Sequence, residues 1–172
     1  RSDVMSILKP TMYQKSIFDI PYEKLKKEKI RCLVFDLDNT LGLISDLTCP
    51  KETKELILKL KKDFIIAISS NNNKKRLDPY TEELRIDGFY WSLKPSTKAL
   101  RKIKKKYNLQ KEELCMIGDQ IVTDIIAGNS FHAKTILVDP LGKKDLKVTG
   151  LNRKIENYII KKGIIERGKY YE

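Results

Sequence analysis

The sequence predicts an α/β fold, a single Rossmann-like three-layer domain whose mainly parallel five-stranded sheet lies between helices. Short apolar runs rich in strand-forming residues alternate with longer amphipathic segments, which is the pattern of strand–helix–strand units. Polar residues gather directly after several of these runs, where open parallel sheets bind their ligands. The length of 172 residues and the hydrophobic content of 41% suit one domain with a substantial core.

The first predicted strand leads directly into two carboxylates. Residues 32–35, Cys-Leu-Val-Phe, form a short apolar run, and Asp36 and Asp38 follow it at once. A short helix is expected before the strand at residues 22–28, because Pro21 favours the start of a helix. Two carboxylates one residue apart do not stabilise a core, so this strand end is the first candidate for chemistry.

The remaining elements follow in alternation. Pro50 and Ser96 are each expected to begin a helix, one by its fixed backbone angle and the other as a cap. Pro79 should kink or divide the helix that contains it, and Gly128 should close a short helix. The predicted helices are 50–62, 74–85, 96–107 and 122–127, and the predicted strands are 64–69, 88–91, 114–117 and 135–138.

The domain is expected to have three parts and no cap. An N-terminal extension (residues 1–29) precedes a catalytic core (30–140), and a basic C-terminal segment (141–172) follows it. The stretches between the polar strand ends hold one helix and one strand each, which leaves no room for an inserted cap domain. An uncapped site would admit large substrates, such as a lipid head group, a polynucleotide end or a phosphoprotein.

Polar side chains follow four of the predicted strands, and together they indicate one site. Each group alone is ordinary loop chemistry, but their joint order and placement are difficult to obtain by chance. Paired carboxylates can bind a hard divalent cation and supply both a nucleophile and a proton donor. A calcium loop would need glycine where Leu41 stands, and a helix where the strand lies. The candidate residues are Asp36, Asp38, Ser70, Asn71, Lys94, Asp119 and Asp124.

This set resembles the haloacid dehalogenase (HAD) superfamily, whose members carry Asp-x-Asp-x-Thr/Val, then Ser or Thr, then Lys, then Gly-Asp-x-x-x-x-Asp. All four elements stand between Asp36 and Asp124. Within subclass III, the chain resembles the YqeG-type phosphatases, which are related to phosphatidylglycerophosphate phosphatases. The residues that carry this likeness are Lys9-Pro10, 13–17, 35–41, Ser70-Asn-Asn72, Gly118-Asp-Gln120, Asn129 and 135–138.

Chemistry and resemblance imply the same mechanism. Asp36 would attack phosphorus and form an aspartyl-phosphate, which splits one difficult displacement into two easier ones. Asp38 would protonate the leaving oxygen and later take a proton from the hydrolytic water. An acid at this second position favours phosphatase chemistry over other uses of the fold.

The resemblance also implies roles for the other candidates. Mg²⁺ is expected on the carboxylates of Asp36 and Asp119 and on the backbone carbonyl of Asp38. Asp124 would bind the metal through water or orient Lys94. Whether Ser69 or Ser70 faces the phosphate stays open, and Ser70 is preferred because it directly precedes Asn71. The residues expected to donate to the phosphoryl oxygens are Ser70, Asn71 and Lys94.

The chain is basic, with 35 Lys and Arg against 23 acids and a net charge of +12. This excess predicts attraction to polyanions, although a merely solvated basic surface is an alternative. Cations concentrate at residues 101–106 and from residue 141 onward. In that last segment an apolar stripe could dock on the sheet or lie on an anionic membrane. The stripe consists of Leu151, Ile155, Tyr158 and Ile159.

The resemblance favours phosphatidylglycerophosphate as the substrate and phosphatidylglycerol as the product, a step of phospholipid biosynthesis. One alternative is another exposed or soluble phosphomonoester, such as a nucleic-acid end, although no nucleic-acid motif is present. A second alternative is an RNA- or ribosome-binding module with vestigial activity, which the intact Asp36, Asp38, Lys94 and Asp119 disfavour. The oligomeric state stays open.

Other residues indicate a cytoplasmic protein. Cys32, Cys49 and Cys115 are widely spaced and suggest structural thiols of a reducing compartment. No secretory signal or membrane-spanning apolar run is evident, so peripheral contact with the inner membrane surface is the membrane association considered. His132, the only histidine, is expected on the surface.

Overall fold

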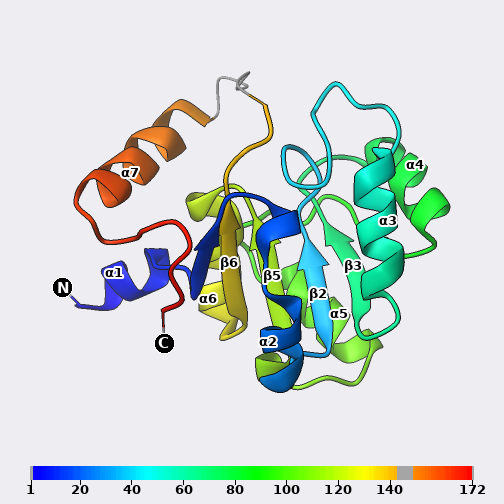
Figure 1. The fold of residues 1–172 in the computed structure, drawn as a ribbon, viewed down its shortest axis with the longest axis horizontal. Coiled ribbons are helices and arrows are strands. Elements are labelled where there is room, and N and C mark those ends of the chain that lie inside the picture. The colour runs from blue at the N-terminus through cyan, green and yellow to red at the C-terminus, as the bar shows by residue number, and fades with distance from the viewer. Residues whose placement is uncertain (1, 143–148, 172) are drawn as a thin grey trace.

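The computed structural model describes residues 2–142 and 149–171. Within these residues, parallel strands form one sheet in the order β1-β6-β5-β2-β3-β4. Helices cover both faces of the sheet (Figure 1), so the predicted three-layer α/β fold is confirmed. The strands are β1 (Met12–Gln14), β2 (Cys32–Phe35), β3 (Ile65–Ser69), β4 (Asp87–Phe89), β5 (Leu114–Gly118) and β6 (Lys134–Val138).

The prediction of five strands is wrong, because the sheet described here has six. The added strand, β1, lies in the segment expected to be an extension and pairs in parallel with β6. Its residues Met12 and Tyr13 are buried, at 1% and 5% exposure. Three residues are too few to show a strand periodicity, so only the partner strand reveals this one.

Helices fill the outer layers. They are α1 (Ser2–Leu8), α2 (Tyr22–Lys27), α3 (Lys51–Leu60), α4 (Lys74–Leu84), α5 (Lys98–Lys106), α6 (Ile126–Phe131) and α7 (Thr149–Lys161). The boundaries of α2 to α5 lie within two residues of the expected ones, whereas α6 begins and ends four residues later than the helix predicted at 122–127. Residues 39–93 hold only α3, β3, α4, β4 and their loops, which confirms that no cap domain is inserted there.

The central strand β2 shows how two cores form. Its side chains alternate between the faces of the sheet, as the pleat of a strand requires. Leu33 and Phe35 belong to one buried cluster, together with residues of α2, α3 and α4. Cys32 and Val34 belong to the cluster on the other face, together with residues of α5 and α6. All four side chains are fully buried, which makes β2 the centre of the fold.

Two helix predictions need correction. Pro79 lies inside α4, which runs as one helix from Lys74 to Leu84, so the proline does not divide it, and the kink stays a prediction. Gly128 lies within α6 and does not close it, because His132 ends that helix in the left-handed conformation. A Cβ on Gly128 would lie 2.3 Å from Cγ2 of Thr135, so glycine permits the helix to approach β6.

The C-terminal helix α7 packs on the fold. Ile159 is 2% exposed in a cluster with Tyr13 and Leu137, and Ile155 is partly buried against the same cluster. Tyr158 is 58% exposed, so it does not share the docked face. The predicted stripe also included Leu151, whose side chain is not among those described. Residues 143–148 of the basic segment lie outside the described residues as well. The docking interpretation therefore holds for this helix.

The remaining structural expectations concern thiols and membrane spans. The three cysteines are free and buried, and burial raises the pKa of the Cys49 thiol to about 11, which disfavours a reactive thiolate. His132 is exposed as predicted. None of the helices in the described ranges combines the length and the hydropathy that crossing a membrane requires.

Candidate active site

The predicted site lies at the carboxyl edge of the sheet, where β2, β3 and β5 end side by side. The backbone N–H of Asp36 donates to the carbonyl of Ile117 on β5 at 2.9 Å. This bond continues the β-ladder one residue beyond β2 and fixes the main chain of Asp36. The carboxylate of Asp36 therefore stands at the centre of the sheet edge, with its side chain 14% exposed.

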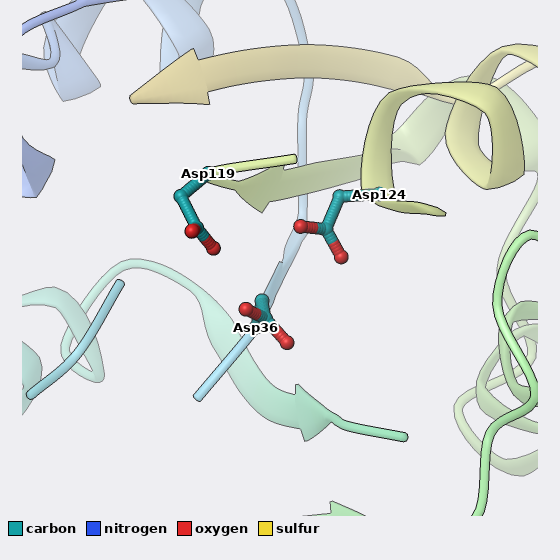
Figure 2. A group of neighbouring side chains, drawn as sticks. All are labelled: Asp36, Asp119 and Asp124. Carbon is teal, nitrogen blue, oxygen red and sulfur yellow. The ribbon is translucent and has the colours of Figure 1, made fainter. Parts of the chain in front are cut away.

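Three carboxylates converge at this edge. Asp36, Asp119 and Asp124 each offer an oxygen, and these oxygens lie within 4.8 Å of one another. Figure 2 shows the three side chains directed toward a common centre from the ends of β2 and β5 and from a helical turn. That turn is a π-helix (Ile121–Ile125) that leads into α6, where a shorter α-helix was predicted. π-helical turns are rare and occur often at functional sites.

Gly118 makes room for this arrangement. A Cβ at Gly118 would lie 2.2 Å from a carboxylate oxygen of Asp124, a distance that no side chain tolerates. The Asp124 carboxylate is also held from within its own loop, because the N–H of Gln120 donates to it at 3.2 Å. The Gly-Asp sequence at the end of β5 therefore has a steric reason: glycine lets Asp124 fold back over the strand end.

Lys94 connects the carboxylates. Its Nζ donates to Asp36 Oδ1 at 2.8 Å, to Asp124 Oδ1 at 2.6 Å and to the carbonyl of Ser69 at 2.8 Å. The side chain is only 3% exposed, so this is a buried, charge-assisted network. All three ammonium protons are engaged, and the positive charge of Lys94 lies beside the Asp36 oxygens.

The site holds more negative than positive charge, and the pKa values of Asp119, Asp124 and Lys94 are raised accordingly. Burial raises the pKa of Asp119 well above its usual range, and the carboxylates of Asp36 and Asp124 raise it further. Burial, and then Asp36, raise the pKa of Asp124 to about 7, against the lowering effect of Lys94. Burial alone would lower the pKa of Lys94, but Asp124 and Asp36 overcome this and raise it. A further cation would relieve the excess.

Asp38 belongs to an adjacent network. Nε and Nη2 of Arg76 donate to Asp38 Oδ1 at 3.0 and 2.8 Å, and the side-chain amide of Asn72 donates to Oδ2 at 3.1 Å. Both partners of the ion pair are mostly covered, at 14% and 22% side-chain exposure. Arg76 and Asn72 were not predicted. A lysine-rich helix start gives no signal that its third cation faces inward, whereas the Asn repeat at 71–73 did mark the loop.

Arg76 also holds the loop that follows β2. Its Nη1 donates to the carbonyl of Asp46, and its Nη2 to the carbonyl of Leu43 at 3.1 Å. Within the loop, the carboxylate of Asp46 accepts from the N–H of Leu43 at 2.8 Å. One guanidinium therefore fixes both the carboxylate of Asp38 and the loop beside it, a task that suits the planar donor fork of arginine.

The end of β3 separates the two serines. The hydroxyl of Ser69 donates to that of Ser92 at 3.0 Å, whereas the hydroxyl of Ser70 accepts from the N–H of Asn72 at 3.0 Å. Ser70 thus retains its proton for donation, which favours it over Ser69 as the phosphate contact. The Asn71 side chain bridges to the main chain of Lys94, accepting at 2.7 Å and donating at 3.0 Å.

Asp119 has one partner that was not predicted. The hydroxyl of Thr40 donates to Asp119 Oδ1 at 3.1 Å, and Thr40 is 1% exposed. The threonine of the Asp-x-Asp-x-Thr motif therefore orients a carboxylate from another strand. The structure brings Asp36, Lys94, Asp119 and Asp124 into one cluster. It places Asp38, Ser70 and Asn71 on the loops that border it.

Comparison with known proteins agrees with this geometry. The model of the haloacid dehalogenase-like hydrolases matches residues 33–94, and a model described as HAD-hydrolase-like matches residues 93–150. The probable phosphatase YqeG of Bacillus subtilis is 37% identical over 155 residues, which cover 88% of each chain. Phosphatidylglycerophosphate phosphatase 1 of Arabidopsis thaliana is 27% identical over 146 residues, 79% of this chain and 42% of that protein.

Solved structures show the same fold. An uncharacterized protein from Listeria monocytogenes superposes with a TM-score of 0.54 at 17% identity, covering 67% of this chain and 84% of that one. A HAD family enzyme from Bacteroides thetaiotaomicron, crystallised with magnesium and inorganic phosphate, gives 0.51 at 12% identity, with coverage of 70% and 99%. With the long match to the Bacillus phosphatase, these findings place the chain: it belongs to the haloacid dehalogenase-like hydrolases and is a phosphatase of that family.

Proposed function

We propose that this phosphatase is a Mg²⁺-dependent phosphomonoester hydrolase that works through an aspartyl-phosphate and converts phosphatidylglycerophosphate to phosphatidylglycerol. The observation that carries the chemistry is the placement of Asp36, whose partly exposed carboxylate meets the buried ammonium of Lys94 at 2.8 Å beside two further carboxylates. Phosphoryl transfer needs a nucleophile that the substrate can reach, surrounded by charged groups already positioned to stabilise the transition state.

Asp36 is the nucleophile in this proposal. One of its oxygens bonds to phosphorus while the bond from phosphorus to the leaving alkoxide breaks, and Asp38 gives the alkoxide a proton. Water then attacks the phosphorus of the aspartyl-phosphate, Asp38 takes a proton from it, and inorganic phosphate leaves with Asp36 restored. Arg76 and Asn72 donate to the two oxygens of Asp38, which would hold the carboxylate in place to take the proton from water. To give a proton to the alkoxide, Asp38 would first have to take one up from solvent on Oδ2, the oxygen that faces Asn72 and not Arg76.

The phosphoryl oxygens require donors as charge spreads over them. Ser70 has its hydroxyl proton available, and the second amide proton of Asn71 is also a candidate. Lys94 would act mainly through its charge, because its three protons already serve Asp36, Asp124 and the carbonyl of Ser69. Direct donation from Lys94 to the phosphate would need one of these contacts to open.

The residues fit a magnesium ion. Hard oxygen ligands suit Mg²⁺, and within the described residues the three clustered carboxylates form ion pairs with a single cation, Lys94. Asp36 and Asp119, with the backbone carbonyl of Asp38, are the proposed ligands, and Asp124 orients Lys94. When bound, the ion would offset the repulsion among the carboxylates and neutralise charge on the phosphate.

Stabilisation by Mg²⁺ should grow with pH. The folded-state pKa values of Asp119 and Asp124 lie above the ordinary values, so the folded chain keeps these protons longer than the unfolded chain does. The stability of the metal-free protein therefore falls as the pH rises from about 4 toward the folded-state pKa, which is about 7 for Asp124. Magnesium needs the deprotonated carboxylates, so it binds weakly at low pH.

Thermal melting with and without Mg²⁺ measures this effect. At about 100-fold excess over the dissociation constant, we expect the melting temperature to rise by roughly 5–10 °C near pH 8 and by less than half as much near pH 5. Asp119→Asn, which keeps an oxygen to accept from Thr40, should abolish the rise and stabilise the metal-free protein near pH 8. An equal rise at both pH values would exclude these carboxylates as ligands.

The substrate proposal has two supports. The Arabidopsis relative, of which this chain spans 42%, is a phosphatidylglycerophosphate phosphatase. The site has no inserted cap between Asp38 and Lys94, so a head group at the surface of a bilayer could reach Asp36. A net charge of +12 favours any such anionic surface.

The test is Mg²⁺-dependent phosphate release from phosphatidylglycerophosphate in mixed micelles. It runs beside a panel of soluble phosphomonoesters and phosphorylated nucleic-acid ends, with Asp36→Asn as the blank. Preference for the lipid by orders of magnitude, lost in the variant, would support the proposal. Preference for a soluble ester or a nucleic-acid end would support the proposed reaction mechanism and reject phosphatidylglycerophosphate as the substrate. Equal release by enzyme and blank would remove the chemistry.

A further inference from the structure

Large apolar side chains gather around the active site although water surrounds them. Of the fourteen exposed large apolar residues in the described ranges, seven lie on loops that follow β2, β4 and β6 at the carboxyl edge. Figure 1 shows the loops after β2 and β6 rising beyond that edge. We call these seven the apolar rim: Leu43, Ile44, Leu47, Tyr90, Trp91, Leu93 and Leu141. Soluble proteins rarely gather apolar groups in this way without a partner.

The rim is built on anchored backbone. Arg76 holds the carbonyls of Leu43 and Asp46, so the loop with Leu47, which is 80% exposed, is fixed at its base. Trp91 and Leu93 both have positive φ, at 46° and 54°, a backbone region that non-glycine residues seldom occupy. The exposure of these side chains therefore follows from a defined backbone conformation and not from loop flexibility.

Exposed lysines stand on the same edge. In a parallel sheet the helix after each strand begins at the carboxyl edge, and α3, α4 and α5 follow β2, β3 and β4. Their first residues include four exposed lysines, against one acid in the three first turns, Glu52. Cations are unfavourable at helix N-termini, so the helix dipoles do not explain these lysines. Among the described residues, Lys74 alone of the four has a partner within its helix, Asp78, at 2.9 Å. These edge lysines are Lys51, Lys74, Lys75 and Lys98.

We propose that the apolar rim and the edge lysines form a docking surface for an anionic phospholipid bilayer. Apolar side chains that enter the acyl boundary, beside cations that meet anionic head groups, are the two elements of peripheral membrane binding. An occupant of the rim also stands over Asp36, so it either blocks the site or presents the phosphomonoester itself. A bilayer containing the substrate does the latter.

This inference rests on the proposed function and refines it. It assigns membrane contact to the catalytic edge and not to the docked face of α7, whose Ile159 is buried in the fold. A head group would then enter the site along the bilayer normal, with Leu47 on the loop after β2 and Trp91 on the loop after β4 seated among the lipids. Lipid extraction into water would not be needed.

Trp91 provides a direct readout, because it is the only tryptophan of the chain and is 57% exposed. We expect its emission to shift to the blue on adding vesicles of phosphatidylglycerol mixed with phosphatidylcholine, and brominated acyl chains to quench it. Vesicles of phosphatidylcholine alone should bind at least about tenfold more weakly, because the lysines lack their partners. The experiment needs no phosphatase activity.

Matched variants test whether vesicle binding depends on the apolar rim and the edge lysines in particular, and not on surface hydrophobicity or net charge in general. Ile44→Ser combined with Leu47→Ser should weaken vesicle binding by about tenfold or more, whereas Leu58→Ser, on the far part of α3 and 43% exposed, should not. Replacing the four edge lysines by Gln should weaken vesicle binding further, by up to several hundredfold, since one cation near an anionic surface is worth roughly fivefold. The matched charge control replaces four exposed lysines of the opposite edge: Lys27, Lys29, Lys59 and Lys62.

Two results would overturn the docking surface. The first is that Trp91 emission stays unchanged at saturating anionic vesicles while a soluble phosphomonoester is still hydrolysed. This result would support the proposed phosphatase reaction and reject the membrane-docking surface. The other is a blue shift that grows with protein concentration in the absence of lipid and is lost in the Ile44→Ser, Leu47→Ser variant, which makes a second copy the occupant. A vesicle-dependent shift without hydrolysis of any phosphomonoester would instead keep the surface and remove the proposed function.

Discussion

Asp36→Asn is expected to lower the turnover of a soluble phosphomonoester by at least about 10⁴-fold, the scale seen when a covalent nucleophile is removed. Asparagine has the same shape, and its side-chain oxygen can still accept from Lys94, so the loss would be chemical and not structural. The neutral amide cannot form the aspartyl-phosphate that divides the reaction into two steps. Turnover with and without Mg²⁺, beside a melting curve, measures the effect.

Asp38→Asn gives a matched comparison that separates the nucleophile from the acid–base residue. This variant should lose roughly 10²–10⁴-fold in turnover, since proton transfer is worth that much. It should still carry radiolabelled phosphoryl after an acid quench with an activated ester, because Asp36 remains. Asp36→Asn should carry none. Equal labelling of the two variants, or Asp36→Asn activity within tenfold of the unmodified enzyme, would rule out Asp36 as the nucleophile.

The sheet edge could be predicted because chain order and polarity coincide there. In a parallel sheet every strand ends at the same edge, so Asp36, Ser70, Lys94 and Asp119 had to lie near one another once their strands were recognised. The order of the strands was not predicted; the structure places β3 and β5 on either side of β2, which brings the ends of these three strands together. The strand β1 could not be predicted, since its three residues show no period and its pairing with β6 is a long-range contact.

Side-chain partners were beyond prediction for a different reason. Arg76 follows two exposed lysines on α4, and only the position of the loop after β2 determines that its guanidinium faces Asp38. The same holds for Thr40, whose hydroxyl reaches Asp119 across strands that are far apart in sequence. The π-helical turn that carries Asp124 depends on the room left by Gly118, which no periodicity reports. Sequence patterns predict elements and their ends, whereas these contacts depend on tertiary geometry.

Lys94→Met is expected to cost about 3–5 kcal/mol of the free energy of unfolding near pH 8, because it leaves Asp36 and Asp124 without their buried cation. For a chain of this size the loss corresponds to a fall in melting temperature of roughly 10 °C or more. The raised pKa of Lys94 keeps it charged throughout neutral pH, so the pH dependence comes from its partners. Asp124, with a pKa of about 7, is protonated near pH 5, and the loss should be smaller there.

A second variant keeps this prediction testable if Lys94→Met folds poorly. Adding Asp124→Asn removes the stranded carboxylate while the asparagine oxygen can still accept from the N–H of Gln120, so most of the lost stability should return near pH 8. Phosphatase activity should not return, since the charge beside Asp36 is still missing. Lys98→Met, an exposed lysine four residues away, is the matched control and should stay within about 0.5 kcal/mol of the unmodified protein. A double variant no more stable than Lys94→Met would mean that Lys94 supports the fold through its packing and not through the charges of Asp36 and Asp124.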